Sequence, residues 1–150
     1  MRTFNYVTFH ERSWKLLESN NISRIVNCTH NIENYFPGKC QYYNIAIGKW
    51  RQHHDESDPH LLWAFLLPYL QFVEGELDSG HNVLLHCLAG AHRAGTAAVL
   101  AVMFLTGMDS KQVNIDTNLQ CILLCTLIGF IAIRKKEIAL KTNSTNKVRA

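Results

Sequence analysis

The residues best suited to chemistry form one short run, in which five residues separate a cysteine from an arginine. This run is His86-Cys87-Leu88-Ala89-Gly90-Ala91-His92-Arg93. It follows an apolar segment and precedes a helix-like one, and the backbone N–H groups of such a loop can point inward to hold a tetrahedral anion. The helix N-terminus adds the positive end of its dipole, and Arg93 offers a planar fork that matches two phosphate oxygens. The run therefore predicts a phosphate-binding loop.

Cys87 lies at the floor of this predicted loop. The N–H groups and the helix dipole that would hold a phosphate also favour the thiolate form of a cysteine. A thiolate beneath a bound phosphate is placed for in-line attack on phosphorus. A cysteine after a strand is usually a small buried apolar residue, but its combination with Gly90, Arg93 and a following helix favours a nucleophile.

The segments around the loop alternate between helical and extended patterns. The expected helices cover residues 10–20, 60–77 and 93–105, and the expected strands cover residues 22–28, 41–47 and 82–86. Residues 82–86 are almost uninterruptedly apolar, as in a central strand that is covered on both faces. The order predicts an α/β fold, a three-layer sandwich with a central, mostly parallel sheet flanked by helices.

Single residues mark the expected ends of the helices. Asp58 followed by Pro59 has the pattern of an N-cap and a first helical residue. Pro68 predicts a kink or a break in the second helix, and Gly107 predicts the end of the third. Residues 49–59, rich in histidine and aspartate, are expected to form a polar loop.

Composition limits the class of protein. The 150 residues fit one domain, and the net charge of +3 is far from that of a dedicated nucleic-acid binder. Five irregularly spaced cysteines without a CxxC pair argue against a disulfide framework or a structural zinc site. The first residues lack the apolar segment of a secretory signal. We therefore expect the protein in a reducing compartment, the cytoplasm, with the nucleus as the alternative. The sequence does not indicate an oligomeric state.

The C-terminal part has a different pattern. Residues 119–133 are apolar on all sides, and a polar tail follows. The favoured interpretation is a buried helix that covers the sheet. A short membrane anchor is the alternative, although 15 residues are fewer than the roughly 20 that a span needs, and a segment that is not properly folded is a third interpretation.

The motif HCLAGAHRAGT resembles the HC-x5-R signature of the protein tyrosine phosphatase superfamily, and the chain resembles its small, atypical dual-specificity phosphatases. The resemblance extends to ISRIVNCTHNIENYFPGKCQYYNIAI and to AAVLAVMFLTGMDSKQ. It implies a catalytic domain over residues 1–113 with an abbreviated N-terminus, followed by a divergent apolar helix and polar tail over residues 114–150. It also implies hydrolysis of a phosphorylated protein substrate without a metal or other cofactor.

Carried over to this chain, the resemblance makes Cys87 the nucleophile and Arg93 the residue that holds the phosphoryl oxygens. His86 would orient the loop and help to keep Cys87 ionised; it also has the simpler interpretation of a histidine at the end of a strand. The residues that would bind phosphate through their backbone N–H groups are Leu88, Ala89, Gly90, Ala91 and His92.

The general acid must be an aspartate on a loop that reaches the leaving-group oxygen, and the polar loop offers two. The family places its acid about thirty residues before the cysteine, and Asp55 and Asp58 both fit that position. Asp58 already has a structural role as the expected N-cap, so Asp55 is the favoured acid and Asp58 the alternative.

One residue beside the loop departs from the family pattern. Ala94 follows Arg93, where the family usually has a serine or threonine whose hydroxyl bonds the cysteine sulfur. Slow hydrolysis of the phosphocysteine is the expected consequence, and Thr96 is expected to point elsewhere. Ala94 and the divergent C-terminus favour an alternative in which the chain is a pseudophosphatase that binds phosphopeptides; the intact Cys87, Arg93 and Asp55 favour an enzyme.

Overall fold

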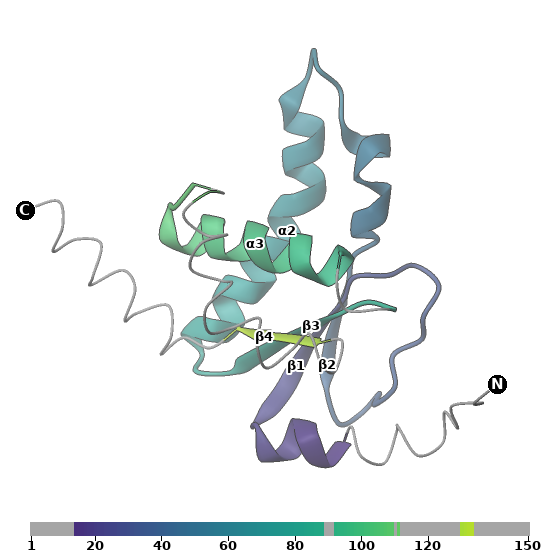
Figure 1. Ribbon diagram of the computed structural model, residues 1–150, viewed down its shortest axis with the longest axis vertical. Helices are drawn as coiled ribbons and strands as arrows, with labels where there is room; N and C mark the ends of the chain where they lie inside the picture. The colour runs from purple at the N-terminus through teal and green to yellow at the C-terminus, as the bar shows by residue number, and fades with distance from the viewer. Residues whose placement is uncertain (1–13, 89–91, 110, 112–129, 134–150) are drawn as a thin grey trace, which may run out of the picture.

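The computed structural model describes residues 14–88, 92–109, 111 and 130–133. Its centre is a four-stranded sheet in the order β2-β1-β3-β4 (Figure 1). Strands β1 (Ile22–Asn27), β2 (Gln41–Asn44) and β3 (Asn82–His86) are parallel, and β4 (Phe130–Ile133) is antiparallel to β3. The prediction of a mostly parallel sheet is confirmed.

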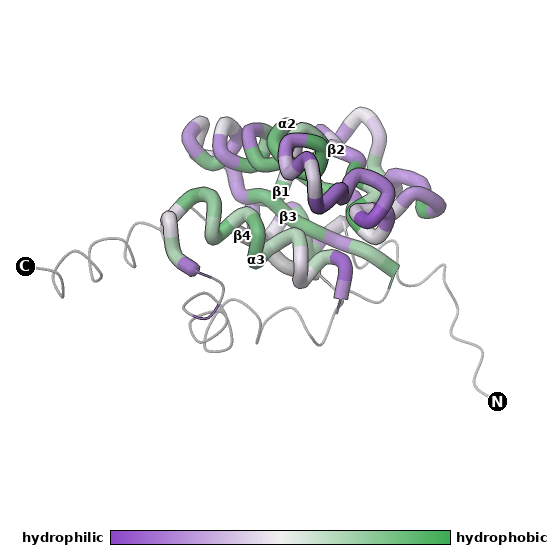
Figure 2. Tube along the Cα trace, turned by 90° about the horizontal axis from the view of Figure 1, so that it is seen from above, coloured by the Kyte–Doolittle hydropathy of each residue, from purple (hydrophilic) through white to green (hydrophobic). Residues whose placement is uncertain are grey.

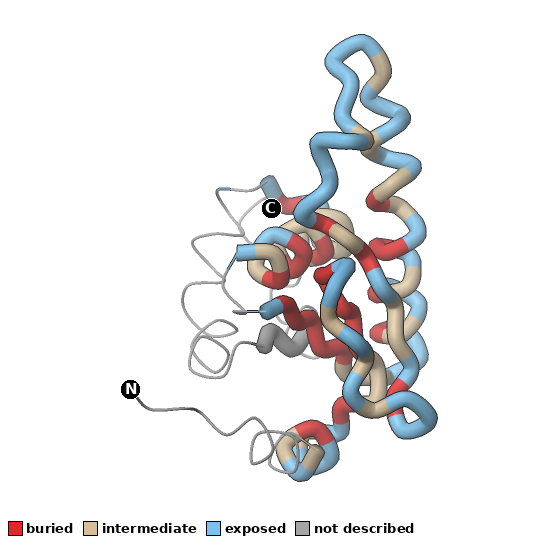
Figure 3. Tube along the Cα trace, turned by 90° about the vertical axis from the view of Figure 1, so that its right-hand side faces the viewer, coloured by how far each residue is buried: buried red, intermediate tan, exposed pale blue. Residues whose placement is uncertain are grey.

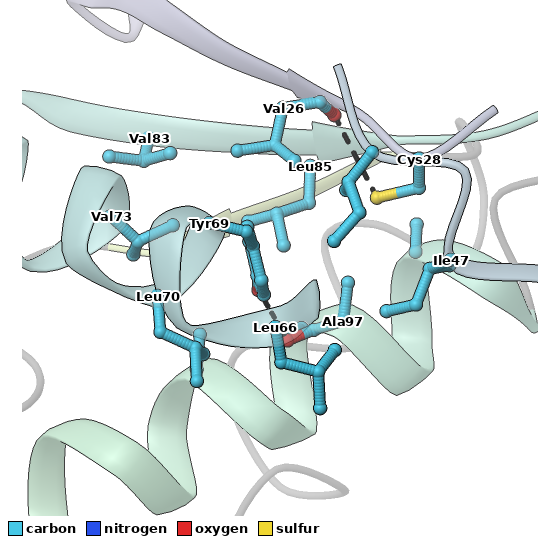
Figure 4. Packing of buried hydrophobic residues seen from close by; sticks show 14 of the residues in the cluster. Val26, Cys28, Ile47, Leu66, Tyr69, Leu70, Val73, Val83, Leu85 and Ala97 are labelled. Atoms are coloured by element: carbon cyan, nitrogen blue, oxygen red, sulfur yellow. Dashed lines mark hydrogen bonds between the residues drawn. The ribbon is translucent and has the colours of Figure 1, made fainter. Parts of the chain in front are cut away.

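Two helices cover one face of the sheet. Helix α2 (Pro59–Asp78) and helix α3 (Arg93–Thr106) pack with Val26, Val83 and Leu85 in the larger of two apolar clusters. The Tyr69 hydroxyl joins the helices by donating a hydrogen bond of 2.6 Å to the carbonyl of Ala97 (Figure 4). This cluster fixes α3, and with it Arg93, the last residue of the predicted phosphate-binding loop.

The other face has a smaller cluster, in which the short helix of residues 14–19 contributes Leu17. Leu17 packs with Ile25 and Leu84, whose side chains alternate with those of Val26 and Leu85 along their strands. Helices therefore lie on both faces, and the predicted α/β sandwich is confirmed.

The helix ends follow the predicted signals. The Asp58 side chain accepts a hydrogen bond of 3.0 Å from the His60 N–H, so Asp58 is the N-cap and Pro59 the first residue of α2. Gly107 ends α3 in the left-handed conformation, with φ of 68°. Pro68 does not break the helix, because α2 continues from Pro59 to Asp78. Its buried side chains hold the helix together although Pro68 cannot donate a backbone hydrogen bond.

Two further predictions are corrected. The second strand ends at Asn44 rather than at residue 47, and much of the expected polar loop is the 3-10 helix η1 (Ile47–His53). Of the apolar helix predicted over residues 119–133, the last four residues are β4, and residues 119–129 lie outside the described residues. Aromatic and β-branched residues favour a strand here, and β4 pairs with β3 along an edge that would otherwise be open.

Candidate active site

Two cysteines follow neighbouring parallel strands. Asn27 at the end of β1 pairs with His86 at the end of β3, and Cys28 extends the ladder by donating its backbone N–H to the His86 carbonyl at 2.8 Å. Cys87 is 7% exposed and Cys28 is fully buried, both in the cluster beneath α2 and α3. The carboxyl edge of the sheet therefore places Cys87 at the top of the core, where a strand gives way to a loop.

The charges of Cys87 and Arg93 both act on the Cys28 thiol. Burial raises the pKa of Cys28 to about 12; the negative charge of Cys87 raises it further, and the positive charge of Arg93 opposes the rise. Each of these charges acts over a limited distance in the protein. Cys87 thus follows the end of β3 and Arg93 begins α3, and the charges of both act on Cys28 at the carboxyl edge of the sheet; the roles expected of Cys87 and Arg93 stay predictions.

Helix α3 begins at Arg93, and between its first turn and Thr106 at its end it is hydrophobic (Figure 2). Its small buried residues, including Ala94, Ala97 and Ala101, allow it to lie close to the core. The N–H groups of the first turn of a helix lack intrahelical acceptors. An anion held at this end would meet these N–H groups, the helix dipole and the Arg93 guanidinium.

The start of η1 lies against the Arg93 side chain. A Cβ atom on Gly48 would lie 3.4 Å from Cδ of Arg93, and η1 is beside the N-terminal end of α3 (Figure 1). The absence of a side chain on Gly48 therefore leaves room for Arg93. The sequence analysis did not identify Gly48, because no local pattern links it to a residue 45 positions away.

His86 is buried at 4% exposure, and its ring centre is 6.3 Å from that of Tyr35. Burial lowers the pKa of His86 to about 4. The imidazole is therefore neutral at physiological pH. It can orient the backbone around Cys87, but any support that it gives to a thiolate must come from hydrogen bonding rather than from positive charge.

Asn27 organises the neighbouring loop, and the sequence analysis missed it. Its side-chain amide nitrogen donates to the Ile32 carbonyl at 2.8 Å and to the Asn34 side chain at 3.0 Å. Its side-chain oxygen accepts from the backbone N–H and the hydroxyl of Thr29, at 3.1 and 2.7 Å. A polar residue ending an apolar strand was the available signal, since a buried amide needs such partners. Asn27 thereby fixes the loop after β1 next to His86.

Asp55 occupies a different setting. It lies in the turn between η1 and α2, at the exposed tip of a projection from the body of the protein (Figures 1 and 3). Its carboxylate accepts hydrogen bonds from the Ser57 hydroxyl at 2.7 Å and the Ser57 N–H at 2.8 Å. These bonds lower the pKa of Asp55, with a smaller contribution from His54. Among the described interactions, none joins Asp55 to Cys87 or Arg93.

Of the five residues predicted to bind phosphate through their backbone, the structure describes only the first and the last, Leu88 and His92. Ala89, Gly90 and Ala91 lie outside the described residues. Leu88 is 70% exposed, and His92 is exposed at the N-cap position of α3.

The two residues beside the loop that bear on turnover are both described. Ala94 is fully buried. The Thr96 hydroxyl donates to the His92 carbonyl at 2.9 Å, within its own helix, as expected for a residue that does not replace the missing hydroxyl at position 94.

Among the described residues, no group of three or more His, Cys, Asp or Glu is arranged to hold a metal ion. None of the helices in this part of the chain is long and apolar enough to cross a membrane.

Comparison with known proteins identifies relatives of the chain. It is 30% identical over 102 residues to protein phosphatase Slingshot homolog 3 of mouse, and 29% identical over 89 residues to protein phosphatase Slingshot of Drosophila melanogaster. It is 24% identical over 95 residues to dual specificity protein phosphatase 1-A of Xenopus laevis. The chain is a relative of the dual-specificity phosphatases, within the protein tyrosine phosphatase superfamily.

These matches cover 68%, 58% and 63% of this chain, but only 15%, 8% and 24% of the respective relatives. The chain thus spans a small part of the length of each relative. No family model and no solved structure matches it. Each of these relatives is named as a protein phosphatase.

Proposed function

We propose that this dual-specificity phosphatase relative hydrolyses phosphotyrosine, and also phosphoserine and phosphothreonine, through a phosphocysteine intermediate. The observation that carries the proposal is the joint position of Cys87 and Arg93, at the end of a buried strand and the start of α3. A phosphate held between them would face a nucleophile on one side and helix N–H groups on the other.

In the first step, the Cys87 thiolate attacks phosphorus while the bond from phosphorus to the leaving oxygen breaks. Arg93 and the backbone N–H groups of residues 88–92 hold the three non-bridging oxygens, where negative charge is concentrated. Asp55, in its protonated form, donates a proton to the leaving oxygen. The product alcohol or phenol departs, and the phosphoryl group remains on sulfur.

In the second step, a water molecule attacks the phosphocysteine, and the Asp55 carboxylate accepts the proton that this water loses. The bond between sulfur and phosphorus breaks, and Cys87 leaves as a thiolate. A hydroxyl at position 94 would stabilise that thiolate, but Ala94 has none. We therefore expect the second step to limit the rate.

Asp55 can act only if the turn moves from the tip of the projection towards Cys87, or if the substrate extends to it. Among the described residues, its hydrogen bonds are to Ser57 and to the Asp58 N–H, both within the same turn, so the turn is a local unit that could move without disrupting the core. The negative charge of a bound phosphate would also raise the pKa of a nearby carboxyl and favour its protonated form.

A second candidate function is a phosphopeptide-binding module with little turnover. Two observations favour it: Ala94 lacks the hydroxyl that aids release, and Asp55 is exposed and has a lowered pKa. A lowered pKa disfavours the protonated form that a general acid needs.

The two candidates are separated by incubating the protein with a phosphotyrosine peptide and a phosphoserine peptide and measuring free phosphate. The proposal expects repeated turnover that disappears in Cys87→Ser, while this variant still binds both peptides. Tight binding by the unmodified protein with no phosphate release would instead establish the binding module.

A further inference from the structure

A second surface next to the phosphate loop is exposed and has no assigned role. It is the helix η1, which follows β2 and begins against Arg93 through Gly48. Residues 48–52 are all exposed, and Trp50, a large aromatic residue, is 39% exposed. Large exposed aromatic side chains next to a site are a frequent feature of interaction surfaces. The helix η1 is therefore an exposed surface next to the position at which a phosphate bound to Arg93 would lie.

The charges on η1 are positive and unpaired within the described residues. Lys49 and Arg51 are both exposed, and no described carboxylate lies within ion-pair distance of either. The Arg51 guanidinium lies 5.4 Å from the ring centre of Trp50, where it can interact with the aromatic face. This contact orients Arg51 while its charge stays available to an anionic partner.

The charge changes sign farther along the projection. Asp55, Glu56 and Asp58 lie in the turn after η1, at the tip (Figure 1). The carboxylates of Asp55 and Asp58 accept hydrogen bonds from Ser57 and His60, within that turn and the start of α2. The projection is thus cationic near Arg93 and anionic at its far end.

We propose that η1 recognises acidic residues next to the phosphorylated residue of a protein substrate, with Lys49 and Arg51 binding their carboxylates and Trp50 packing against the peptide. The proposal rests on the proposed function, because it places the phosphorylated residue at Arg93. A 3-10 helix rises about 2 Å per residue, so Lys49 and Arg51 lie within roughly 6 Å of Gly48 along the axis. An extended peptide covers about 3.3 Å per residue, so the acidic positions lie within about three residues of the phosphorylated one.

The expected selectivity is modest and sensitive to salt. Exposed ion pairs are individually weak, and two of them together correspond to roughly a tenfold preference at low ionic strength. Added salt screens such pairs and reduces the preference. Basic residues at the same substrate positions would face like charges and bind less tightly than neutral ones.

The test measures binding rather than turnover, in the full chain carrying Cys87→Ser. Two fluorescein-labelled phosphotyrosine peptides are compared, one flanked by glutamate and aspartate and one by glutamine and asparagine. The variant Lys49→Glu/Arg51→Glu is compared with Lys15→Glu/Lys111→Glu, which makes the same change in net charge. Lys15 and Lys111 are exposed and lie outside η1, Lys15 on the helix below the sheet (Figure 1).

We expect the parent protein to bind the acidic peptide about tenfold more tightly than the neutral one. The ratio should fall to one or below in the η1 variant and stay near tenfold in the control variant. A ratio of one in the parent protein, or an equal loss in the control variant, would overturn the inference and leave the proposed function intact. Failure to bind either phosphopeptide would overturn both.

Discussion

Cys87 is only 7% exposed, and it follows a strand whose two faces are both covered by other parts of the protein. Asp55, in contrast, is exposed and lies in a turn at the tip of a projection. The position of Cys87 depends on strand pairing and on the apolar cluster beneath α3. The position of Asp55 depends on hydrogen bonds within its own turn, two from Ser57 to its carboxylate and one from the Asp58 N–H to its carbonyl. The proposed nucleophile and the proposed acid thus differ in how firmly the fold holds them. The carboxyl edge of the sheet should act as a rigid anion site, and the turn as a part that must adapt to substrate.

The largest expected effect comes from the rigid region. Replacing Arg93 by alanine removes the charge that holds the phosphoryl oxygens, and kcat/KM for a phosphotyrosine peptide should fall by about 10³-fold. Arg93→Lys should recover only part of this loss, because an ammonium group cannot bind two oxygens in one plane. Steady-state phosphate release measures both. Retention of full activity in Arg93→Ala would show that phosphate is not bound here.

The exposed region should give the next effect, and it should depend on the leaving group. Asp55→Asn removes the proposed proton donor, so kcat/KM for a phosphoserine peptide, which reports the first step and not the slow second one, should fall by about 10²-fold. Aryl phosphates with acidic phenols should be affected much less, because their leaving groups need little protonation. The matched control is Asp58→Asn, since asparagine also caps helices well and Asp58 has a structural role. Equal losses of kcat/KM for both substrate types, or a larger loss of kcat/KM in Asp58→Asn, would contradict the role of Asp55 as the acid of the first step.

The two regions also differ in how far the sequence predicts them. The strand Asn82–His86, the helix beginning at Arg93 and its end at Gly107 follow from local patterns, because burial demands apolar residues and a left-handed C-cap favours glycine. The approach of Gly48 to Arg93 and the hydrogen bonds of Asn27 depend on the packing of segments that are distant in sequence. The prediction of a helix was wrong for Phe130–Ile133, which form a strand, because a short apolar run fits a helix and a strand equally well until its partner is known.

Protonation of His86, in the buried region, should change the free energy of unfolding with pH. The pKa of His86 is about 4 in the folded protein, below its unfolded value of about 6.5, so the unfolded state binds more protons between these values. The stabilising contribution is complete above pH 6.5 and is lost as the pH falls towards 4, by up to about 3 kcal/mol. Urea unfolding across this range should show a weaker pH dependence in His86→Gln. Identical slopes in both proteins would contradict the buried, neutral imidazole.

A smaller shift is expected at the exposed turn, in rate rather than in stability. Ser57 hydrogen bonds lower the pKa of Asp55, so the protonated acid is lost as the pH rises through that lowered value. Ser57→Ala removes the hydroxyl and should move the basic limb of the kcat/KM profile for phosphoserine, which reports the first step, to higher pH. The pH–rate profiles of the two proteins measure this. A basic limb that stays in place would show that Ser57 does not control the acid.

The most direct test of the account is acid quenching of the protein during its first turnovers with a ³²P-labelled phosphotyrosine peptide. We predict that label accumulates on Cys87 as an acid-stable phosphocysteine faster than free phosphate appears, because Ala94 provides no hydroxyl to the departing sulfur. Ala94→Ser should lower the steady-state fraction of labelled protein and speed phosphate release by about tenfold, the value of one hydrogen bond to a charged group. Phosphate release with no labelled protein in either form, or no label and no release, would contradict the proposed mechanism.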